Sequence, residues 1–313
     1  ASVKYYYDFN LNKNSQFLPI ADLDLAKLAG RTFIKNSAVS LAAGRYAVSD
    51  LTGKIFNQNC DGISVKVSVP GIEYGFYGGY TGLLNALNVT MLDENHTVSE
   101  TESSIYSKAH DYIPLVLSAE MPSAILNQSV SVQASAFFDM DATKYNRFYL
   151  SAGLKGPIAG PLFYSLTSAL SSSTFKDYSL YGCLDLQAFI SSFSIKLTGE
   201  YATGSQFGFT PFTTFTSYTA YNSVMYPELT GVILPGFDAS FSEDGFYASL
   251  GGKLVLDFPE EEILIKGINA TGSFIMVPFS DLQIGLSAVY YFNLETIGEN
   301  NNLIASLNVS LSF

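Results

Sequence analysis

A strict alternation of apolar and polar residues constrains the fold of this chain most, and it is clearest at the carboxyl end. Apolar residues occupy every second position from Leu303 to Phe313, and serine or asparagine separates them from position 306 onward. Successive side chains of a β-strand point to opposite faces, so this segment has one apolar and one polar face. The four positions that define the closing strand are Leu307, Val309, Leu311 and Phe313.

The same alternation recurs along the chain, for example over 129–141, 193–204, 245–258 and 282–295. Each run has about ten residues, the length that a tilted strand needs to cross a bilayer. The sequence contains no apolar run of the roughly 18 residues that indicates a membrane-spanning helix. These runs predict a membrane protein that crosses with strands.

Composition separates this prediction from a soluble β-sandwich. Hydrophobic residues make up 48% of the chain and charged residues only 14%, whereas soluble domains carry about 25% charged residues. A sandwich needs charge on its outer faces, and this chain has too little. The formal net charge of −12 also argues against nucleic-acid binding, which requires a basic surface.

We predict an all-β, closed antiparallel transmembrane barrel of about 16 strands (14–18), formed by residues 1–313 as a single domain. The predicted strands are 2–11, 18–29, 32–47, 63–70, 72–84, 112–123, 129–141, 147–157, 162–171, 178–190, 193–204, 232–242, 245–258, 262–279, 282–295 and 302–313. The first three are the least defined, and a helix over 21–28 is an alternative. For the strand 32–47, the sequence does not decide which face points into the barrel.

Connection lengths support this strand count. The connections 48–62, 85–111 and 205–231 are long, and those at 69–71, 190–192, 242–244 and 279–281 are tight. Long and short connections alternate in phase, as the external loops and periplasmic turns of such barrels do.

The terminal strand, which ends on Phe313, resembles the recognition signal of bacterial outer-membrane barrels. This resemblance implies an outer-membrane location, contact with its lipid, and insertion by the barrel-assembly machinery through that strand. It also allows a homotrimer. No basic-then-apolar leader precedes the first strand, so we expect a mature chain from which a signal peptide has been removed.

A barrel of about sixteen strands is too wide for side chains to fill, so its interior holds water. The inward-facing rows are predicted to be small and polar with scattered charges. The predicted pore-wall residues are Lys66, Glu73, Glu120, Asp139, Arg147, Lys155, Asp185, Lys196, Glu200, Lys253 and Asp257.

The third outward connection, 85–111, is similar in order and length to the constriction loop of general porins. It carries the acidic residues Asp93, Glu94, Glu100, Glu102 and Asp111. Acidic side chains in a narrow pore favour cations, so we expect mild cation selectivity if this loop enters the lumen. A solvated surface loop is the alternative. The chain has only three arginines, which departs from the arginine-rich wall of those porins.

Two further segments have both a functional and a structural interpretation. Residues 44–53, followed by Asp61 and Gly62, are loosely similar to the opening strands of substrate-selective porins. The alternative is that their Asp, Gly and Ser residues only form turns. The connection 205–231 is rich in Phe and Tyr, and serves either as a substrate contact or as packing on the rim or on a neighbouring protomer.

No catalytic grouping, metal site or cofactor site is expected. His96 and His110 share one external connection, so Ser99, Ser103 or Ser104 with His110 and Asp111 is a hydrolase alternative. Cys60 and Cys183 have no metal-type spacing, and a disulfide between them is an open alternative.

We therefore expect a non-enzymatic, porin-like channel for passive diffusion of small hydrophilic solutes. The alternatives are an outer-membrane transporter of hydrophobic substrates and a surface-exposed adhesion or structural barrel.

Overall fold

The structure is a computed structural model that describes residues 2–8, 18–86, 106–140, 145–205, 208–216, 229–257, 263–279, 282–294 and 301–311. Within these ranges the regular secondary structure consists of β-strands. The described residues include no helix long and apolar enough to cross a membrane.

Sixteen strands lie within the described residues, as the sequence predicts. They are β1 (Ser2–Asp8), β2 (Leu18–Ile34), β3 (Ser37–Ser49), β4 (Asn57–Val69), β5 (Ile72–Tyr80), β6 (Tyr112–Ile125), β7 (Gln128–Asp139), β8 (Arg147–Ala159), β9 (Leu162–Ser172), β10 (Ser179–Ile190), β11 (Phe193–Ala202), β12 (Val232–Glu243), β13 (Phe246–Asp257), β14 (Leu264–Phe279), β15 (Leu282–Asn293) and β16 (Asn302–Leu311).

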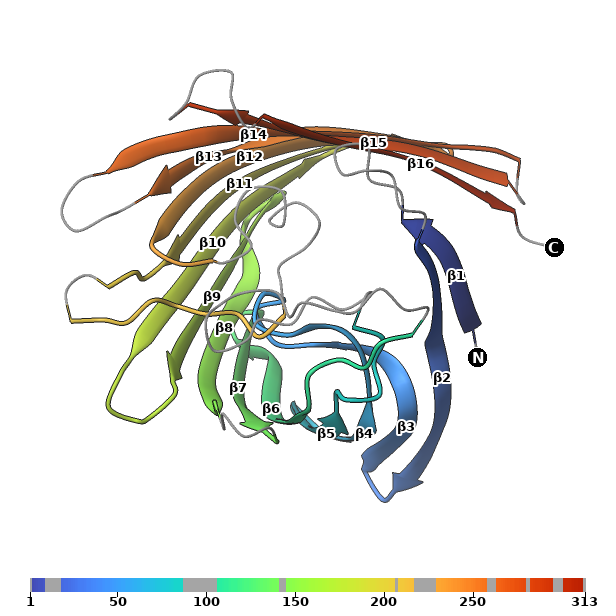
Figure 1. Cartoon of the computed structure of the whole chain (residues 1–313), viewed down its shortest axis with the longest axis vertical. Coiled ribbons are helices and arrows are strands. Elements are labelled where there is room, and N and C mark those ends of the chain that lie inside the picture. The colour runs from blue at the N-terminus through green and yellow to red at the C-terminus, as the bar shows by residue number, and fades with distance from the viewer. Residues whose placement is uncertain are drawn as a thin grey trace. The chain divides into compact units, whose positions relative to one another are not determined.

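The strands are hydrogen-bonded in chain order from β1 to β16 (Figure 1). The ladders from β1 to β7 and from β10 to β16 are antiparallel. The described residues contain no ladder between β1 and β16, so closure of the sheet into a barrel stays a prediction.

The strand boundaries differ most from the sequence prediction at two places. β2 continues to Ile34, and its turn lies at Lys35–Asn36, because the apolar positions of 26–34 pair in register with β3. The helical alternative for 21–28 is therefore wrong. β4 begins at Asn57, which pairs with Ser49, so the first long connection shortens from 48–62 to the compact segment 50–56.

The chain divides into two compact units, which are described separately. Unit 1 comprises Ala1–Gly153, Ala169–Tyr178 and Thr213–Thr219, and unit 2 comprises Leu154–Ser168, Ser179–Phe212 and Ala220–Phe313.

In unit 1 the apolar face of the sheet is exposed and the opposite face is covered. On β6, Leu117 is 58% exposed, whereas its neighbour Val116 is 7% exposed. On β7, Val132 is exposed while Gln133 and Ser135 are buried. A soluble protein buries its apolar face, so this inverted pattern is that of a sheet whose apolar face meets lipid. We call the two faces the apolar face and the polar face.

Unit 2 has the same two faces. Leu197, Phe237 and Leu250 are exposed, whereas Thr198 and Glu200 on β11 are buried. At the carboxyl end, exposed Leu307 pairs with exposed Leu286. On the other face the hydroxyls of Ser306 and Ser287 lie 2.6 Å apart. Phe313 lies outside the described residues, as does the side chain of Leu311.

Candidate functional site on the polar face

The connection 50–56 is a compact turn organised by the buried carboxylate of Asp50. One oxygen of Asp50 accepts hydrogen bonds from the amides of Ile55 (3.0 Å) and Phe56 (2.9 Å). The other accepts from the amide and hydroxyl of Thr52, at 2.8 and 2.6 Å. Burial raises the pKa of Asp50, and these four donors oppose that shift because they stabilise the carboxylate. Thus one acidic side chain holds the backbone of the whole turn.

This turn is attached to the polar face of the sheet. The amide of Leu51 donates to Oε1 of Gln133 on β7 at 2.7 Å. Ile55 and Phe56 are 1% and 0% exposed, so the end of the turn is packed and not solvated.

A second connection, 203–231, contributes the segment Thr213–Thr216 to the same place. The amides of Phe215 and Thr216 donate to the carbonyl of Ile55 at 2.8 and 2.9 Å. In return, the amide of Asn57 donates to the hydroxyl of Thr216 at 3.1 Å. These bonds join two connections that are about 160 residues apart in the sequence. We call the segment 213–216 the strap.

Two side chains of β8 anchor the strap from the sheet. Nη1 of Arg147 donates to the carbonyl of Thr214 at 2.8 Å, and the hydroxyl of Tyr149 donates to the carbonyl of Thr213 at 2.9 Å. The Arg147 guanidinium also lies over the rings of Phe215 and Tyr112, 4.8 and 5.5 Å from their centroids. Arg147, predicted as a bare pore-wall charge, is 3% exposed and binds the strap.

Aromatic rings fill the space between the strap, the turn and the sheet. The Phe215 ring stacks on Phe137 at 4.2 Å and contacts Tyr112 edge-on at 4.6 Å. Phe56 lies 5.6 Å from both Phe137 and Phe215. Phe56, Phe137 and Phe215 are each 0% exposed, so the polar face of unit 1 carries a closed apolar cluster at this level.

In unit 2, the preceding part of the same connection packs on β10. Phe212 is fully buried and stacks on Tyr181, with ring centroids 5.5 Å apart. The Phe212 amide donates to the carbonyl of Thr203 at 2.8 Å. Phe212 and Phe215 therefore pack on the polar face of their units, and not on a rim or a neighbouring protomer as the packing interpretation expected. Phe207, Tyr218, Tyr221 and Tyr226 lie outside the described residues.

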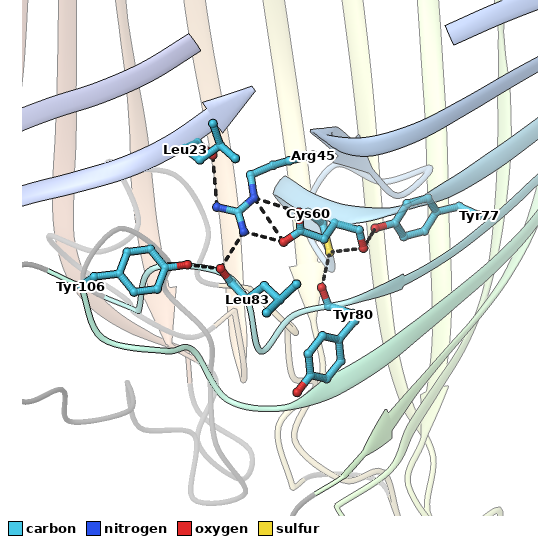
Figure 2. A network of polar contacts seen from close by, with 8 residues as sticks. Leu23, Arg45, Cys60, Tyr77, Tyr80, Leu83 and Tyr106 are labelled. Atoms are coloured by element: carbon cyan, nitrogen blue, oxygen red, sulfur yellow. Dashed lines mark hydrogen bonds and ion pairs between the residues drawn. The ribbon is translucent and has the colours of Figure 1, made fainter. Parts of the chain in front are cut away.

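Arg45 forms a second cross-linked centre in unit 1 (Figure 2). Its guanidinium pairs with Asp61, with Nη2 2.5 Å from Oδ2, and donates to the carbonyls of Leu23 (3.1 Å) and Leu83 (2.6 Å). The hydroxyl of Tyr106 donates to the same Leu83 carbonyl. Arg45 thus ties β2, β4 and both ends of the third connection together. Arg45 and Asp61 are the charged pair of the segment that the sequence offered either as a porin-like opening strand or as turn residues.

The third connection is described only at its two ends. Asn85 and Lys108 form an isolated antiparallel bridge, and the hydroxyl of Thr81 donates to the carbonyl of His110 at 2.6 Å. Asp111 is half-buried. The other four acidic residues predicted for the constriction, Asp93, Glu94, Glu100 and Glu102, lie outside the described residues.

His110 pairs with Asp139 on β7, at 3.1 Å from Nε2 to Oδ1. This partner is one of the predicted wall residues and not Asp111, the partner of the hydrolase alternative. His96, Ser99, Ser103 and Ser104 of that alternative are outside the described residues. Cys60 and Cys183 are thiols and form no disulfide.

The remaining predicted wall charges of unit 1 lie on the polar rows of neighbouring strands. Lys66 on β4 is 3.4 Å from Glu73 on β5. Glu73 stands opposite Glu120 on β6, and Glu120 accepts a hydrogen bond from Ser129 at 3.0 Å.

In unit 2 Lys155 is exposed, and the other predicted wall residues have partners on neighbouring strands. Lys253 pairs with Glu200, which also accepts from the Tyr181 hydroxyl at 3.1 Å. Asp185 accepts from Thr198 at 2.7 Å. Lys196 pairs with Asp238 at 3.8 Å, and Asp257 pairs with Lys266 at 3.4 Å. Asp238 and Lys266 were not among the predicted wall residues. The described residues include no cluster that could hold a metal ion.

Sequence reasoning missed the strap, the Asp50 turn and their aromatic contacts. One signal was available: Phe137 and Tyr149 stand on rows otherwise occupied by Ser131, Ser135 and Ser151. A large aromatic side chain on a polar row indicates that something packs on that face. The identity of the packing partner is not encoded locally.

Comparison with solved structures agrees with this architecture. The chain is similar to Pseudomonas aeruginosa OccK3 (OpdO), with a TM-score of 0.61 at 11% identity over 92% of this chain and 79% of that one. For P. aeruginosa OprD the TM-score is 0.53 at 12% identity, over 99% and 85% of the two chains. For a variant of the Rh. blastica porin it is 0.50 at 10% identity, over 99% and 96%.

No protein-family model matches the sequence, and no curated protein matches it. At identities of 10–12%, the similarity to solved structures shows the fold alone. The chain has a porin-like fold, as its alternating strands predict.

Proposed function

We propose that the chain is a porin-like channel for passive diffusion of small hydrophilic solutes across the bacterial outer membrane. One observation supports this most strongly: in both units large apolar side chains are exposed on one face of the sheet, whereas polar side chains such as Gln133 in unit 1 and Glu200 in unit 2 are buried on the other. Such a sheet is stable only when lipid contacts its apolar face. The polar face then lines an aqueous interior.

Closure of residues 1–313 into one barrel follows from the same argument. An open sheet edge leaves backbone amides and carbonyls without partners in lipid, which costs several kcal/mol for each group. Pairing of β1 with β16 removes both edges. The predicted insertion by the barrel-assembly machinery through Leu307–Phe313, and the predicted homotrimer, belong to this proposal.

The strap and the Asp50 turn are the proposed narrowing elements of the pore. Both pack on the polar face of β6–β8, and their aromatic cluster excludes water from that part of the cross-section. This assignment gives the second and sixth external connections the role that general porins give to the third. The third connection, through Asp93, Glu94, Glu100 and Glu102, stays a proposed contributor to charge selection.

We propose mild cation selectivity. Four described wall acids, Glu73, Glu200, Asp238 and Asp257, pair with lysines, so much of the acidic charge of the wall is compensated. The excess of 28 acidic over 16 basic residues then acts through the external connections, where low-dielectric walls focus the field.

The test is single-channel conductance of the purified chain in a planar bilayer, with the reversal potential measured across a salt gradient. We expect discrete steps and a reversal potential of cation-selective sign. A folded, inserted chain that never conducts would contradict the channel and favour an adhesion or structural barrel.

Neither competing function has comparable support. A transporter of hydrophobic substrates needs an apolar lumen pocket, whereas the described polar rows carry Ser131, Gln133, Thr198 and Glu200. The described His110 pairs with Asp139, a wall residue and not the partner expected for a hydrolase, and we propose no enzymatic activity.

A further inference from the structure

A groove crosses the apolar face of unit 1 near the external ends of β6–β9. Its apolar lining includes Leu115, Leu117, Ala136, Phe138, Phe148 and Leu150, and it encloses about 380 Å³. A second depression of about 440 Å³ shares Leu117, Ala134 and Leu150 with it and extends toward Val67 and Tyr74. Alanines between larger side chains create the hollow. We call the two depressions together the outer groove.

Aromatic rings form one wall of the outer groove. Phe138 contacts Phe148 edge-on at 5.8 Å, and Phe148 lies 4.5 Å from Phe175 in the connection between β9 and β10. The Tyr178 hydroxyl donates to the Phe175 carbonyl at 3.0 Å. Phe175 and Tyr178 line the groove although they are 63% and 45% exposed. The wall therefore rises to the level of the external connection.

A lysine stands at the external end of this wall. Lys176 follows Phe175, is exposed, and has no ion pair among the described residues. The neighbouring Asp177 forms no ion pair with Lys176 among the described residues, and its oxygens instead accept hydrogen bonds from Ser172, Ser173 and Thr174. A cation above an apolar groove is complementary to a lipid, which carries an anionic headgroup above an acyl chain.

We propose that the outer groove is a specific site for one acyl chain of an anionic, phosphate-bearing lipid, with Lys176 beside its phosphate. The chain lies against Leu117, Ala134 and Leu150, and the Phe148 and Phe175 rings cover its upper part. Aromatic residues concentrate at this level in membrane barrels because their rings suit the interface. The site requires membrane insertion but no conduction, so its test is separate from that of the channel.

The sequence contains no tryptophan, so a single introduced tryptophan reports its own site. We would place one in the groove by Leu150→Trp and, as a control, one outside it by Ile268→Trp. Ile268 is also exposed on the apolar face and lies at a comparable distance from the external end of its strand. Each variant is reconstituted in phosphatidylcholine bilayers with increasing fractions of brominated phosphatidylglycerol or brominated phosphatidylcholine, and quenching is recorded.

For Leu150→Trp we expect brominated phosphatidylglycerol to reach half-maximal quenching at a lipid fraction about fivefold lower than brominated phosphatidylcholine does. This factor is the effect of one lysine near the membrane surface on the binding of an anionic lipid. For Ile268→Trp the two curves should coincide. Adding Lys176→Gln to Leu150→Trp should make its curves coincide too. Phe148→Trp is a second reporter of the same groove if Leu150→Trp does not insert.

Coincident curves in both groove reporters, or no effect of Lys176→Gln, would overturn the proposal. Absence of quenching by either lipid in the groove reporters, with normal quenching of Ile268→Trp, would show that a second copy of the chain covers the groove.

Discussion

The ring of Phe215 stacks on that of Phe137 at 4.2 Å, although one belongs to an external connection and the other to the polar face of β7. This contact fixes the strap on the wall. We predict that Phe215→Ala raises single-channel conductance, because the strap loses its side-chain anchor and the cross-section widens. Truncating this buried ring should also lower the free energy of unfolding by about 3–5 kcal/mol.

The control for this variant is Phe163→Ala, which shortens an exposed ring on the apolar face. It should leave conductance unchanged. Equal conductance of Phe215→Ala and wild type would show that the strap does not limit the pore.

Asp50→Asn tests the turn that carries Phe56. An asparagine keeps one acceptor oxygen, but its NH₂ group replaces the second oxygen. The backbone amides that donate to that oxygen in the wild type would then face another donor. We expect a loss of about 1–3 kcal/mol, the cost of an unsatisfied buried polar group, measured by urea titration of refolding. Ser49→Ala at the adjacent exposed position should change stability little. A neutral Asp50→Asn would contradict the role of Asp50 in holding the turn.

Leu307→Arg tests the facing of the closing strand. Leu307 and its partner Leu286 are exposed on the apolar face, so an arginine there should destabilise the barrel by about 2–4 kcal/mol near the bilayer midplane. Asn308→Arg, one position further, should be tolerated because its side chain lies on the polar face. Similar sensitivity of the two positions in a refolding titration in lipid would contradict this facing.

Selectivity is tested by neutralising Asp93, Glu94, Glu100 and Glu102 together. We predict that the reversal potential moves toward zero, most clearly at about 0.01 M salt, where the Debye length reaches roughly 30 Å. Asp185→Asn on the wall is the comparison, and because it removes one charge and not four it should move the reversal potential less. An anion-selective wild type would reject the mechanism.

Asp177 should make the connection 173–178 acid-sensitive. Burial alone would raise its pKa, but hydrogen bonds from Thr174 and Ser173 outweigh burial and hold the pKa well below its usual value. A lowered folded-state pKa means that the carboxylate stabilises the fold above about pH 4 and that this contribution is lost as pH falls further. The hydrogen-exchange protection factors of 172–178, which remove the intrinsic pH dependence of exchange, should therefore stay constant down to about pH 4 and fall below it.

In Asp177→Asn this pH dependence should be absent, and exchange should already be faster at pH 7. Identical exchange of the variant and the wild type at pH 7 would contradict the role of Asp177.

The sequence by itself determined the strands and their two faces. The alternation from Leu303 to Leu311, and its repeats, encode sixteen strands and the face that each side chain takes, because strand periodicity is local and has a period of two. The turn at Pro70–Gly71 is likewise local, since Gly71 has a φ of 82° that other residues rarely adopt. Where the alternation weakens, as over 21–34, the predicted boundary moved.

Only the tertiary structure decided what covers the polar face. The bond between Arg147 and the Thr214 carbonyl, and the bond between Ile55 and Phe215, join residues far apart in the chain. Their formation depends on the sheet bringing both connections to one place, and no local pattern specifies such a partner. The sequence therefore drew attention to the acidic third connection, whereas long-range packing placed the strap and the Asp50 turn on the wall.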